Sequence, residues 1–344
     1  MNESTNYSKY ECRICSNKLD VKLYSLKEMF LCTKEIYEFF QCENCRCIQI
    51  AEFPEDFSAF YPENYYSFKS NESEIIETEN WRIKIKRSLI RKRDEAQLYG
   101  HGILGKILNL FKPLEERKLA SLVGLGLKPN SRILDVGCGS GEFLMHLFDL
   151  GMKDLTGIDP FLDKDILKSN GPKIYKRSLE EISADGSLFD LVMLHHVFEH
   201  VKDPLNVLKH CKKLLKEQGF LLIRIPIADC YAWREYSVNW VQLDSPRHTF
   251  IYSMEAIRML SSEAGLEIVD LKFDSTDFQF WGSIQYANDI CLNAPNSYMV
   301  DQESSIFSRK EIKQFIRRAD KLNEQSDGDQ CVILLRKSID SKNN

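Results

Sequence analysis

The feature that most constrains this chain is a run of alternating glycines behind a short apolar stretch. Residues 133–144 read I-L-D-V-G-C-G-S-G-E-F-L, so Gly137, Gly139 and Gly141 directly follow a segment typical of a buried strand. Glycine has no Cβ, so such a segment can turn sharply into a helix and bring its backbone close to a ligand. Eighteen residues past Gly141, Asp159 ends a second apolar run. A carboxylate at that strand tip is placed to accept hydrogen bonds from a ribose diol.

Two interpretations of this pattern compete, a dinucleotide site and an S-adenosylmethionine site. The dinucleotide fingerprint is G-x-G-x-x-G, whereas this chain has D-x-G-x-G-x-G with Asp135 inside the strand. A pyrophosphate is disfavoured next to a carboxylate, while a donor carrying an ammonium and a sulfonium is favoured there. The segment resembles the first motif of the class I S-adenosylmethionine-dependent methyltransferases.

The order of expected elements agrees with that resemblance. Strands are predicted to end near His195 and to span 219–227, 266–273 and 331–336, and helices to span 205–216, ended by Gly219, and 254–264, with Ser253 as N-cap and Gly265 at the end. Alternating strands and helices indicate a doubly wound, mostly parallel α/β sheet. The resemblance covers about residues 126–337 and implies a seven-stranded, Rossmann-like sheet.

The resemblance also implies which residues hold the methyl donor. The loop from Asp135 to Gly141 should hold its carboxypropyl and amino ends, Asp159 its ribose hydroxyls, and the segment after the third strand its adenine. The full predicted set is Asp135, Gly137, Cys138, Gly139, Gly141, Asp159, Pro160, Phe161, Ser178, Leu179 and His195.

A second constellation lies near the start of the chain. Two C-x-x-C pairs are separated by 26 residues, and they consist of Cys12, Cys15, Cys42 and Cys45. Two such loops can complete a tetrahedral, structural Zn²⁺ site with sulfurs at about 2.3 Å. The alternatives are four reduced cysteines without metal, or a set in which Cys47 replaces Cys45. We therefore expect a small Cys₄ zinc ribbon at 1–56.

An aromatic connector follows the ribbon. It contains Tyr61, Tyr65 and Tyr66, which could pack as a hydrophobic lid or stack on a sugar face. A Cys₄ ribbon, a tyrosine-rich connector and a methyltransferase core in this order resemble sugar methyltransferases of deoxysugar and surface-polysaccharide biosynthesis. That family implies that these tyrosines lie near the substrate. The predicted domains are 1–56, a connector and basic helical linker at 57–125, a methyltransferase domain at 126–337, and a tail at 338–344.

Residues 81–93 of the linker carry seven positive charges. The simplest interpretation is a solvated helix face. The alternatives are a dock for an anionic substrate carrier or for an acidic membrane surface.

Methyl transfer to a hydroxyl requires an aligned acceptor and a base, and histidine titrates near neutral pH. His248 is the first candidate, because it follows the fifth predicted strand where acceptor loops of this fold belong; His196 and His200 are the others. The sugar methyltransferases that this chain resembles include zinc-containing C-methyltransferases, which have the sequence Tyr-His-Glu-His at this position. Here Ser245, Pro246 and Arg247 precede His248 instead. The departure favours methylation of oxygen over carbon. Holding a loop is the alternative role for His248.

Other residues near the predicted acceptor site are assigned to structure or to substrate contact. Tyr231, Trp233 and Arg247 are predicted to contact the substrate, although packing could explain the aromatic pair. Glu199 is interpreted as part of a helix start. A His/Glu metal site is conceivable around it, but no metal-ligand spacing indicates one.

Composition limits the possible functions. The 46 basic and 51 acidic side chains give a net charge of −5, which argues against general nucleic-acid binding. No apolar run is long enough for a membrane span, and the first residues lack a signal-peptide pattern, so we expect a cytoplasmic protein. Its eleven cysteines should then be thiols or metal ligands rather than disulfides.

Three functions stay open. The first is histidine-assisted O-methylation of a nucleotide-linked or carrier-linked sugar, with C-methylation of a deoxysugar as its variant. The second is O-methylation of a quinone or secondary metabolite, and the third is a non-enzymatic binding module. The sequence leaves the oligomeric state open.

Overall fold

The computed structural model describes residues 7–57, 60, 81–114 and 116–338, and the chain divides into two compact units. The first unit contains Met1–Pro62, His196–Lys209 and Ile223–Asn344, and the second contains Glu63–His195 and His210–Leu222. The division predicted from the sequence follows chain order and stays a prediction.

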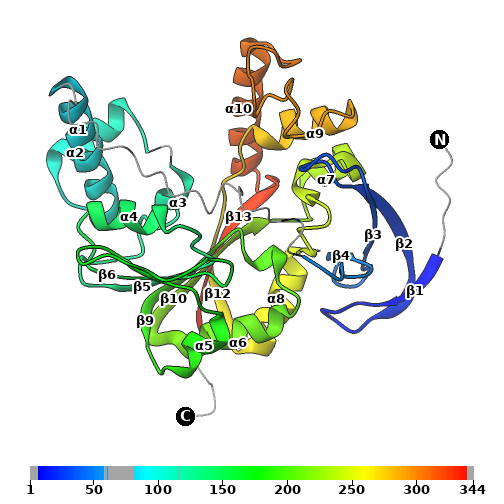
Figure 1. Cartoon of the computed structure of the whole chain (residues 1–344), viewed down its shortest axis with the longest axis horizontal. Coiled ribbons are helices and arrows are strands. Elements are labelled where there is room, and N and C mark those ends of the chain that lie inside the picture. Colours follow the sequence, from blue (N-terminus) through cyan, green and yellow to red (C-terminus); the bar gives the residue numbers. More distant parts are fainter. Residues whose placement is uncertain (1–6, 58–59, 61–80, 115, 339–344) are drawn as a thin grey trace. The chain divides into compact units, whose positions relative to one another are not determined.

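The second unit carries the glycine-rich turn on parallel strands that alternate with helices (Figure 1). β5 pairs in parallel with β6 and β9, and β6 pairs in parallel with β8. Its elements are α1 (Trp81–Tyr99), α2 (Ile103–Phe111), α3 (Arg117–Ala120), β5 (Arg132–Val136), α4 (Glu142–Asp149), β6 (Asp154–Ile158), β7 (Ile166–Leu167), β8 (Lys173–Tyr175), α5 (Leu179–Ala184) and β9 (Phe189–His195). The apolar residues of β5 and β9 are buried, as their sequences predict.

The strands form an eight-stranded sheet in the order β12-β13-β10-β9-β5-β6-β8-β7, so the predicted number of seven was wrong. The added strand is β7, which pairs antiparallel with β8 at the sheet edge. Two residues are too few to produce a periodic pattern, so the sequence gives no sign of β7. The α/β, mostly parallel architecture is as predicted.

The first unit supplies the remaining strands and helices. They are β1 (Tyr7–Glu11), β2 (Lys18–Lys27), β3 (Ile36–Gln41), β4 (Ile48–Ile50), η3 (Phe198–His200), α7 (Tyr231–Tyr236), η4 (Ser237–Asn239), η5 (Val241–Leu243), β11 (Phe250–Ile251), α8 (Met254–Ala264), β12 (Leu266–Phe273), α9 (Phe278–Ala287), α10 (Arg309–Glu324) and β13 (Gln330–Lys337), while α6 (Pro204–Leu214) and β10 (Leu215–Pro226) belong to both units. A five-stranded sheet has the order β1-β2-β3-β4-β11.

Several element ends follow the predicted capping chemistry. The Ser253 hydroxyl accepts a hydrogen bond from the Ala256 N–H at the start of α8, and Gly265 ends that helix in the left-handed region at φ 69°. Gly219 was predicted to end the preceding helix, and this was wrong. α6 ends at Leu214, β10 begins at the next residue, and Gly219 lies inside that strand.

Cys32 and Cys291 form a disulfide, which contradicts the expectation that all cysteines are thiols or metal ligands. The bond joins the β2–β3 turn to the segment after α9, 259 residues later in the chain. Ion pairs of Asp289 with Lys27 and Lys34 lie beside it. Only the fold brings these segments together, so cysteine counting could not predict the pairing.

Within the part of the chain that the structure describes, each helix is too short or too polar to cross a lipid bilayer.

Candidate functional site

The glycine-rich turn between β5 and α4 depends on left-handed backbone conformations. Gly137, Gly139 and Gly141 have φ values of 71°, 54° and 78°, which favour glycine strongly. At Gly141, a Cβ would also lie 1.9 Å from Cδ1 of the buried Ile174. The alternating glycines are therefore required by the turn itself.

The backbone N–H groups of this turn are directed at the protein. The N–H groups of Gly137 and Cys138 donate to the Ile158 carbonyl at 2.8 and 3.2 Å, and the N–H of Gly139 donates to Asp159 Oδ2 at 3.0 Å. A pyrophosphate site needs such donors for the ligand. The turn offers carboxylates instead, which suits a cationic ligand.

Two buried carboxyl groups flank the turn. Asp135 is 4% exposed and Asp159 is 6% exposed. Burial raises the pKa of Asp135 to about 7; Lys118 opposes this shift and Asp159 adds to it. Burial also raises the pKa of Asp159, against the lowering effect of its bonds from the Phe161 and Gly139 N–H groups. A cation bound here would favour the ionised form of both groups.

The other predicted donor-binding residues lie in the same unit but have different surroundings. Phe161 is 57% exposed, and Pro160 is exposed; their contact with an adenine stays a prediction. The Ser178 side chain caps α5 through the Glu181 N–H, so its hydroxyl already has a structural role. His195 is buried with its ring edge-on to Phe143. The remaining predicted pair differs too: Leu179 is buried at the start of α5, and the Cys138 sulfur lies toward Gly157.

The first unit holds a buried cluster around Glu199, whose side chain is fully buried. Its Oε1 lies 3.1 Å from His196 Nδ1 and 3.9 Å from His248 Nε2. Its Oε2 is buried without a hydrogen-bond partner among the described residues. Burial raises the pKa of Glu199, but the bond to His196 and the neighbouring imidazoles outweigh burial and lower the pKa to about 2. Glu199 is therefore an anion at neutral pH, not only part of a helix start.

Hydrogen bonds to backbone carbonyls fix the protonation of two imidazoles in this cluster. Nδ1 of His248 lies 2.7 Å from the Gln242 carbonyl, and Nδ1 of His200 lies 2.9 Å from the Arg247 carbonyl. A carbonyl only accepts, so each Nδ1 carries the proton and Nε2 is the basic nitrogen of the neutral ring. The two rings are in edge-on contact with centroids 4.8 Å apart. Burial lowers the pKa of His200 to about 4, so that ring is neutral at pH 7.

His248 has carboxylates near its basic nitrogen. Nε2 lies 3.6 Å from Asp244 Oδ2 and 3.9 Å from Glu199 Oε1. An imidazole placed in this way can accept a proton and be stabilised as a cation. Asp244 was not predicted from the sequence, and Glu199 was predicted to be part of a helix start. The position of Asp244 four residues before His248 was the available signal.

The same cluster has donor atoms for a cation. One ligand atom each from Glu199, His200 and His248 lie within 4.8 Å of one another. Neutral imidazoles whose Nδ1–H groups are held by carbonyls are typical of metal ligands. The cluster can therefore act either in proton transfer or as a metal centre.

His196 lies in a different network from the other two candidates. Its Nε2 is 2.6 Å from Nη1 of Arg224, and Arg224 is paired with Asp274 at 2.6 Å. A guanidinium only donates, so it occupies the lone pair that a base needs. This geometry favours a positioning role over that of a base, and the catalytic role of His196 stays a prediction.

The predicted substrate residues have contacts within the first unit. Arg247 is buried, donates to both oxygens of Asp244 at 2.7 Å, and stacks 3.7 Å from the ring centroid of Phe30. Tyr231 stacks with Arg318, and the Trp233 indole N–H donates to Gln41 at 3.3 Å. These contacts fit packing, and a substrate role stays a prediction. The remaining predicted residues lie outside the described residues: Tyr61, Tyr65 and Tyr66.

The structure brings the predicted metal ligands together. The four sulfurs lie within 4.8 Å of one another, with Cys12 to Cys45 at 3.5 Å and Cys15 to Cys42 at 3.6 Å. The full set is Cys12, Cys15, Cys42 and Cys45, and the buried Cys47 is outside it. A tetrahedral site with bonds of about 2.3 Å separates its sulfurs by about 3.8 Å. The sulfur set is therefore close to the size that Zn²⁺ requires.

The two cysteine loops have the same backbone design. Ser16 N–H donates to the Cys12 carbonyl at 2.9 Å, and Arg46 N–H donates to the Cys42 carbonyl at 2.8 Å. Ser16 and Arg46 are both left-handed, with φ values of 55° and 59°. The repeated turn aims both cysteine pairs at one point.

The segment that carries the four cysteines (β1–β4), called the ribbon below, contacts the His248 loop, which was not predicted from the sequence. β11, which begins two residues after His248, pairs antiparallel with β4. The Ser253 hydroxyl donates to the Cys45 carbonyl, and the Ile50 N–H donates to the Thr249 carbonyl at 3.0 Å. Through these contacts the ribbon supports the segment that carries His248.

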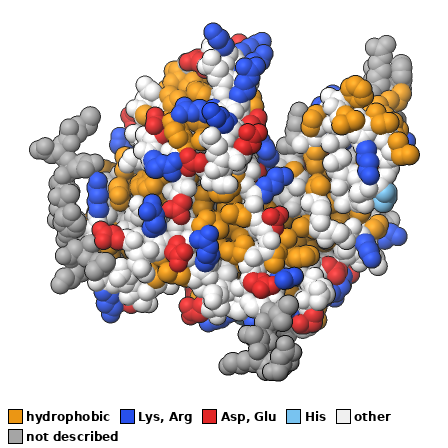
Figure 2. Space-filling view, turned by 180° about the vertical axis from the view of Figure 1, so that it is seen from behind, with side chains coloured by type: hydrophobic (Ala, Val, Ile, Leu, Met, Phe, Trp, Pro, Cys, Tyr) orange, Lys and Arg blue, Asp and Glu red, His pale blue; other side chains and the backbone are white. Residues whose placement is uncertain are grey.

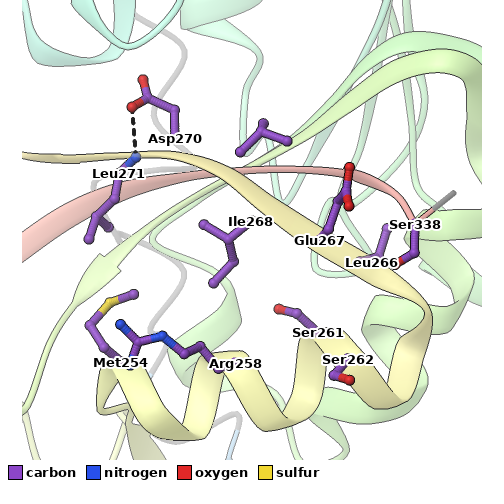
Figure 3. A pocket seen from close by; sticks show the side chains of 11 residues that line it. Met254, Arg258, Ser261, Ser262, Leu266, Glu267, Ile268, Asp270, Leu271 and Ser338 are labelled. Atoms are coloured by element: carbon purple, nitrogen blue, oxygen red, sulfur yellow. Dashed lines mark hydrogen bonds between the residues drawn. The ribbon is translucent and has the colours of Figure 1, made fainter.

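A groove of about 750 Å³ lies between α8 and β12 (Figure 3). Its polar lining includes Arg258, Ser261, Ser262 and Glu267, and the predicted donor and acceptor residues are absent from it. The groove therefore adds nothing to the chemistry of the two clusters.

Comparison with known proteins gives matches to methyltransferases, and the family model spans the glycine-rich turn. A family model described as a methyltransferase domain matches residues 107–271. The ubiquinone biosynthesis O-methyltransferase of Dinoroseobacter shibae is 33% identical over 187 residues, which are 48% of this chain and 75% of that protein. The protein of the same name from Glaesserella parasuis is 29% identical over 50% of this chain and 83% of its own length.

Solved structures match at lower similarity. A SAM dependent methyltransferase from Archaeoglobus fulgidus is 18% identical, with a TM-score of 0.37, over 75% of this chain and 100% of its own. The sequence relatives and the family model show the family: the chain belongs to the S-adenosylmethionine-dependent methyltransferases and is an enzyme of that class.

Proposed function

We propose that the protein transfers a methyl group from S-adenosylmethionine to a hydroxyl oxygen of a small molecule, with His248 accepting the hydroxyl proton. The observation that carries this proposal is the His248 ring, whose Nδ1–H is held by the Gln242 carbonyl and whose Nε2 lies near two carboxylates. A sulfonium is a good leaving group, so the remaining demands on the protein are alignment and proton removal.

The second unit would hold the methyl donor. Asp135 and the turn from Gly137 to Gly141 would face its cationic amino-acid end, because the turn presents carboxylate rather than N–H donors. Asp159 would accept hydrogen bonds from the ribose hydroxyls with the lone pairs that the Gly139 and Phe161 N–H groups leave available. The exposed Phe161 ring would cover the adenine.

Two acceptor classes follow from different observations. A quinone precursor or secondary metabolite is favoured by the relatives named ubiquinone biosynthesis O-methyltransferases. A nucleotide-linked or carrier-linked sugar is favoured by the four clustered cysteines, because the ribbon and connector resemble those of sugar methyltransferases. We place the quinone-type acceptor first, since the relatives of that name are 33% and 29% identical over 48% and 50% of this chain.

The zinc ribbon is part of the same proposal. Four sulfurs of tetrahedral size, presented by two equal turns, would bind one structural Zn²⁺. With four protein ligands the ion keeps no open position for water, so its role would be to stabilise the ribbon and the His248 loop that pairs with it.

The test is an acceptor panel with isotope-labelled S-adenosylmethionine. Hydroxylated quinone precursors and nucleotide-sugars are incubated separately with the enzyme, and products are identified by the mass added by one methyl group. Labelled quinone-type product supports the first acceptor class and labelled sugar the second. Transfer to carbon, in either class, would contradict the proposal of oxygen methylation.

A further inference from the structure

The helix α2 exposes an apolar surface that the described residues of its own unit do not cover. Ile103, Leu110 and Phe111 are 81%, 81% and 85% exposed, and Leu104 and Ile107 are about half exposed. Five large apolar side chains on one nine-residue helix form a patch of the kind that marks an interaction site. Figure 2 shows hydrophobic side chains gathered on the lobe of α1 and α2, at the upper right of that view.

The opposite side of α2 is fixed against α1. A Cβ at Gly105 would lie 2.1 Å from the Lys92 carbonyl oxygen and 2.4 Å from the Ala96 Cβ, so the two helices touch closely at this glycine. At about 100° per residue, Ile103, Ile107 and Leu110 lie on the far side of the helix from Gly105. The patch therefore faces outward because of how α2 packs.

The surroundings of the patch are strongly basic. Residues 85–112 contain seven Lys and Arg side chains and two acidic ones. Both acidic side chains already form ion pairs within α1: Asp94 is buried against Arg93, and Glu95 pairs with Arg91 at 2.6 Å. Exposed basic residues of this segment are Lys86, Arg87, Arg91, Lys92, Lys106 and Lys112.

We propose that the α1–α2 hairpin docks the enzyme on an anionic phospholipid bilayer, with α2 lying in the plane of the headgroups. An apolar helix face on a hairpin rich in exposed lysine and arginine matches an acyl-chain boundary covered by negative headgroups. A second copy of the chain would bring two positive hairpins together and is disfavoured by repulsion. This inference goes beyond the proposed function, because it concerns where the enzyme acts and does not depend on which acceptor is methylated.

The experiment is co-sedimentation of the full-length protein with vesicles of phosphatidylcholine alone or mixed with phosphatidylglycerol. Wild-type protein is expected to bind the anionic vesicles, to bind neutral vesicles at least about tenfold more weakly, and to be released by high salt. The double variant Leu110→Glu/Phe111→Glu is expected to lose anionic-vesicle binding by at least about tenfold.

Matched controls separate docking from misfolding. The double variant Met299→Glu/Val300→Glu changes two exposed apolar residues of the other unit and should bind vesicles as wild type does. Each variant should keep its melting temperature and its affinity for S-adenosylhomocysteine. Wild-type protein that ignores anionic vesicles, or a Leu110→Glu/Phe111→Glu protein that still binds them, would overturn the proposal. A dimer in solution that the same variant dissociates would also overturn it and assign the patch to a second copy.

Discussion

At the scale of single residues, a hydrogen bond selects the ring nitrogen of His248 that carries the proton, and burial raises the pKa of Asp135. The Gln242 carbonyl holds the His248 proton on Nδ1, and the carboxylates of Asp244 and Glu199 lie near Nε2. Asp135 is instead buried at the end of β5, where a neutral carboxyl group is favoured until a cation arrives. The two side chains should therefore respond to different experiments.

Replacing His248 should affect turnover and leave donor binding unchanged. We expect His248→Gln to lower kcat by about 10²–10⁴-fold, because a positioned base contributes about that much. Calorimetry with S-adenosylhomocysteine should give the wild-type Kd. The control is His101→Gln, an exposed histidine stacked on Tyr99, which should keep full activity. If His248→Gln turns over at the wild-type rate, the base has been assigned to the wrong side chain.

The raised pKa of Asp135 predicts pH-dependent donor binding. Below about 7 the buried carboxyl group is mostly protonated, so a cation must displace a proton to gain its attraction. Affinity for S-adenosylmethionine should therefore rise with pH up to about 7 and level off above it. Titration calorimetry at several pH values measures this rise, and Asp135→Asn should abolish it. An affinity that is flat in pH for the wild type would contradict the role given to Asp135.

The same shift predicts the sign of a stability change. A group whose folded pKa is raised gives stability that is present below its unfolded pKa and is lost as pH rises through its folded pKa. For the ligand-free protein, the Asp135 contribution to the free energy of unfolding should thus decline between the ordinary aspartate pKa of 3.8 and about 7.

Two left-handed glycines make a matched pair for testing the turn. A Cβ at Gly186, where φ is 68°, would meet no atom of the described residues within 4 Å, whereas at Gly141 it would lie 1.9 Å from a buried isoleucine. Both alanine variants incur the left-handed penalty of about 1–2 kcal/mol. Gly141→Ala should lose about 1–3 kcal/mol more through overpacking, and also donor affinity. Denaturant unfolding of the two variants measures the difference. Equal losses of free energy of unfolding would show that the turn can accommodate a Cβ at Gly141.

At the scale of elements, the ribbon and the His248 loop are joined by a strand pairing and a hydrogen bond. β4 and β11 pair, and Ser253 joins the cap of α8 to the second cysteine loop. A substitution in the ribbon should therefore affect the His248 loop. It should leave donor binding unchanged, because the predicted donor-binding residues belong to the other unit.

Disrupting the cysteine cluster should separate catalysis from donor binding. Cys42→Ser is expected to reduce bound zinc from about one ion per chain and to lower activity, because the strand next to His248 loses its support. Affinity for S-adenosylhomocysteine should persist. Cys47→Ala is the control, since its sulfur lies outside the cluster. Elemental analysis and activity are measured on the same preparations. A zinc-free Cys42→Ser protein with full activity would show that zinc in the ribbon does not support the His248 loop.

Element types were predictable where local chemistry decides them. The glycine-rich turn, the Ser253 cap and the strand 266–273 appear as the sequence indicates, because each depends on residues next to one another. β7 and β11 contain two residues each, so they have no periodicity to detect and exist only through their partners. For the same reason the sequence suggested His248 but not the Glu199 carboxylate near it, since Glu199 lies 49 residues earlier in the chain.

At the scale of the whole molecule, the Cys32–Cys291 disulfide closes a very long loop in the first unit. Cross-links of this kind stabilise mainly by restricting the unfolded chain. Cys291→Ser should therefore lower the free energy of unfolding by about 2–4 kcal/mol, measured in denaturant without reductant. Thiol titration of the metal-free, denatured wild type should find nine thiols before reduction and eleven after it. Eleven thiols without reduction would rule out the bond in the purified protein.

The pairing of β11 with β4 has a practical consequence for experiments on fragments of this enzyme. An excised fragment bounded by the family match, 107–271, would carry β11 without its neighbour and most of β12 without β13. Bare strand edges invite intermolecular pairing. Such a fragment would aggregate or be inactive. Its inactivity would not show which substrate the intact protein methylates.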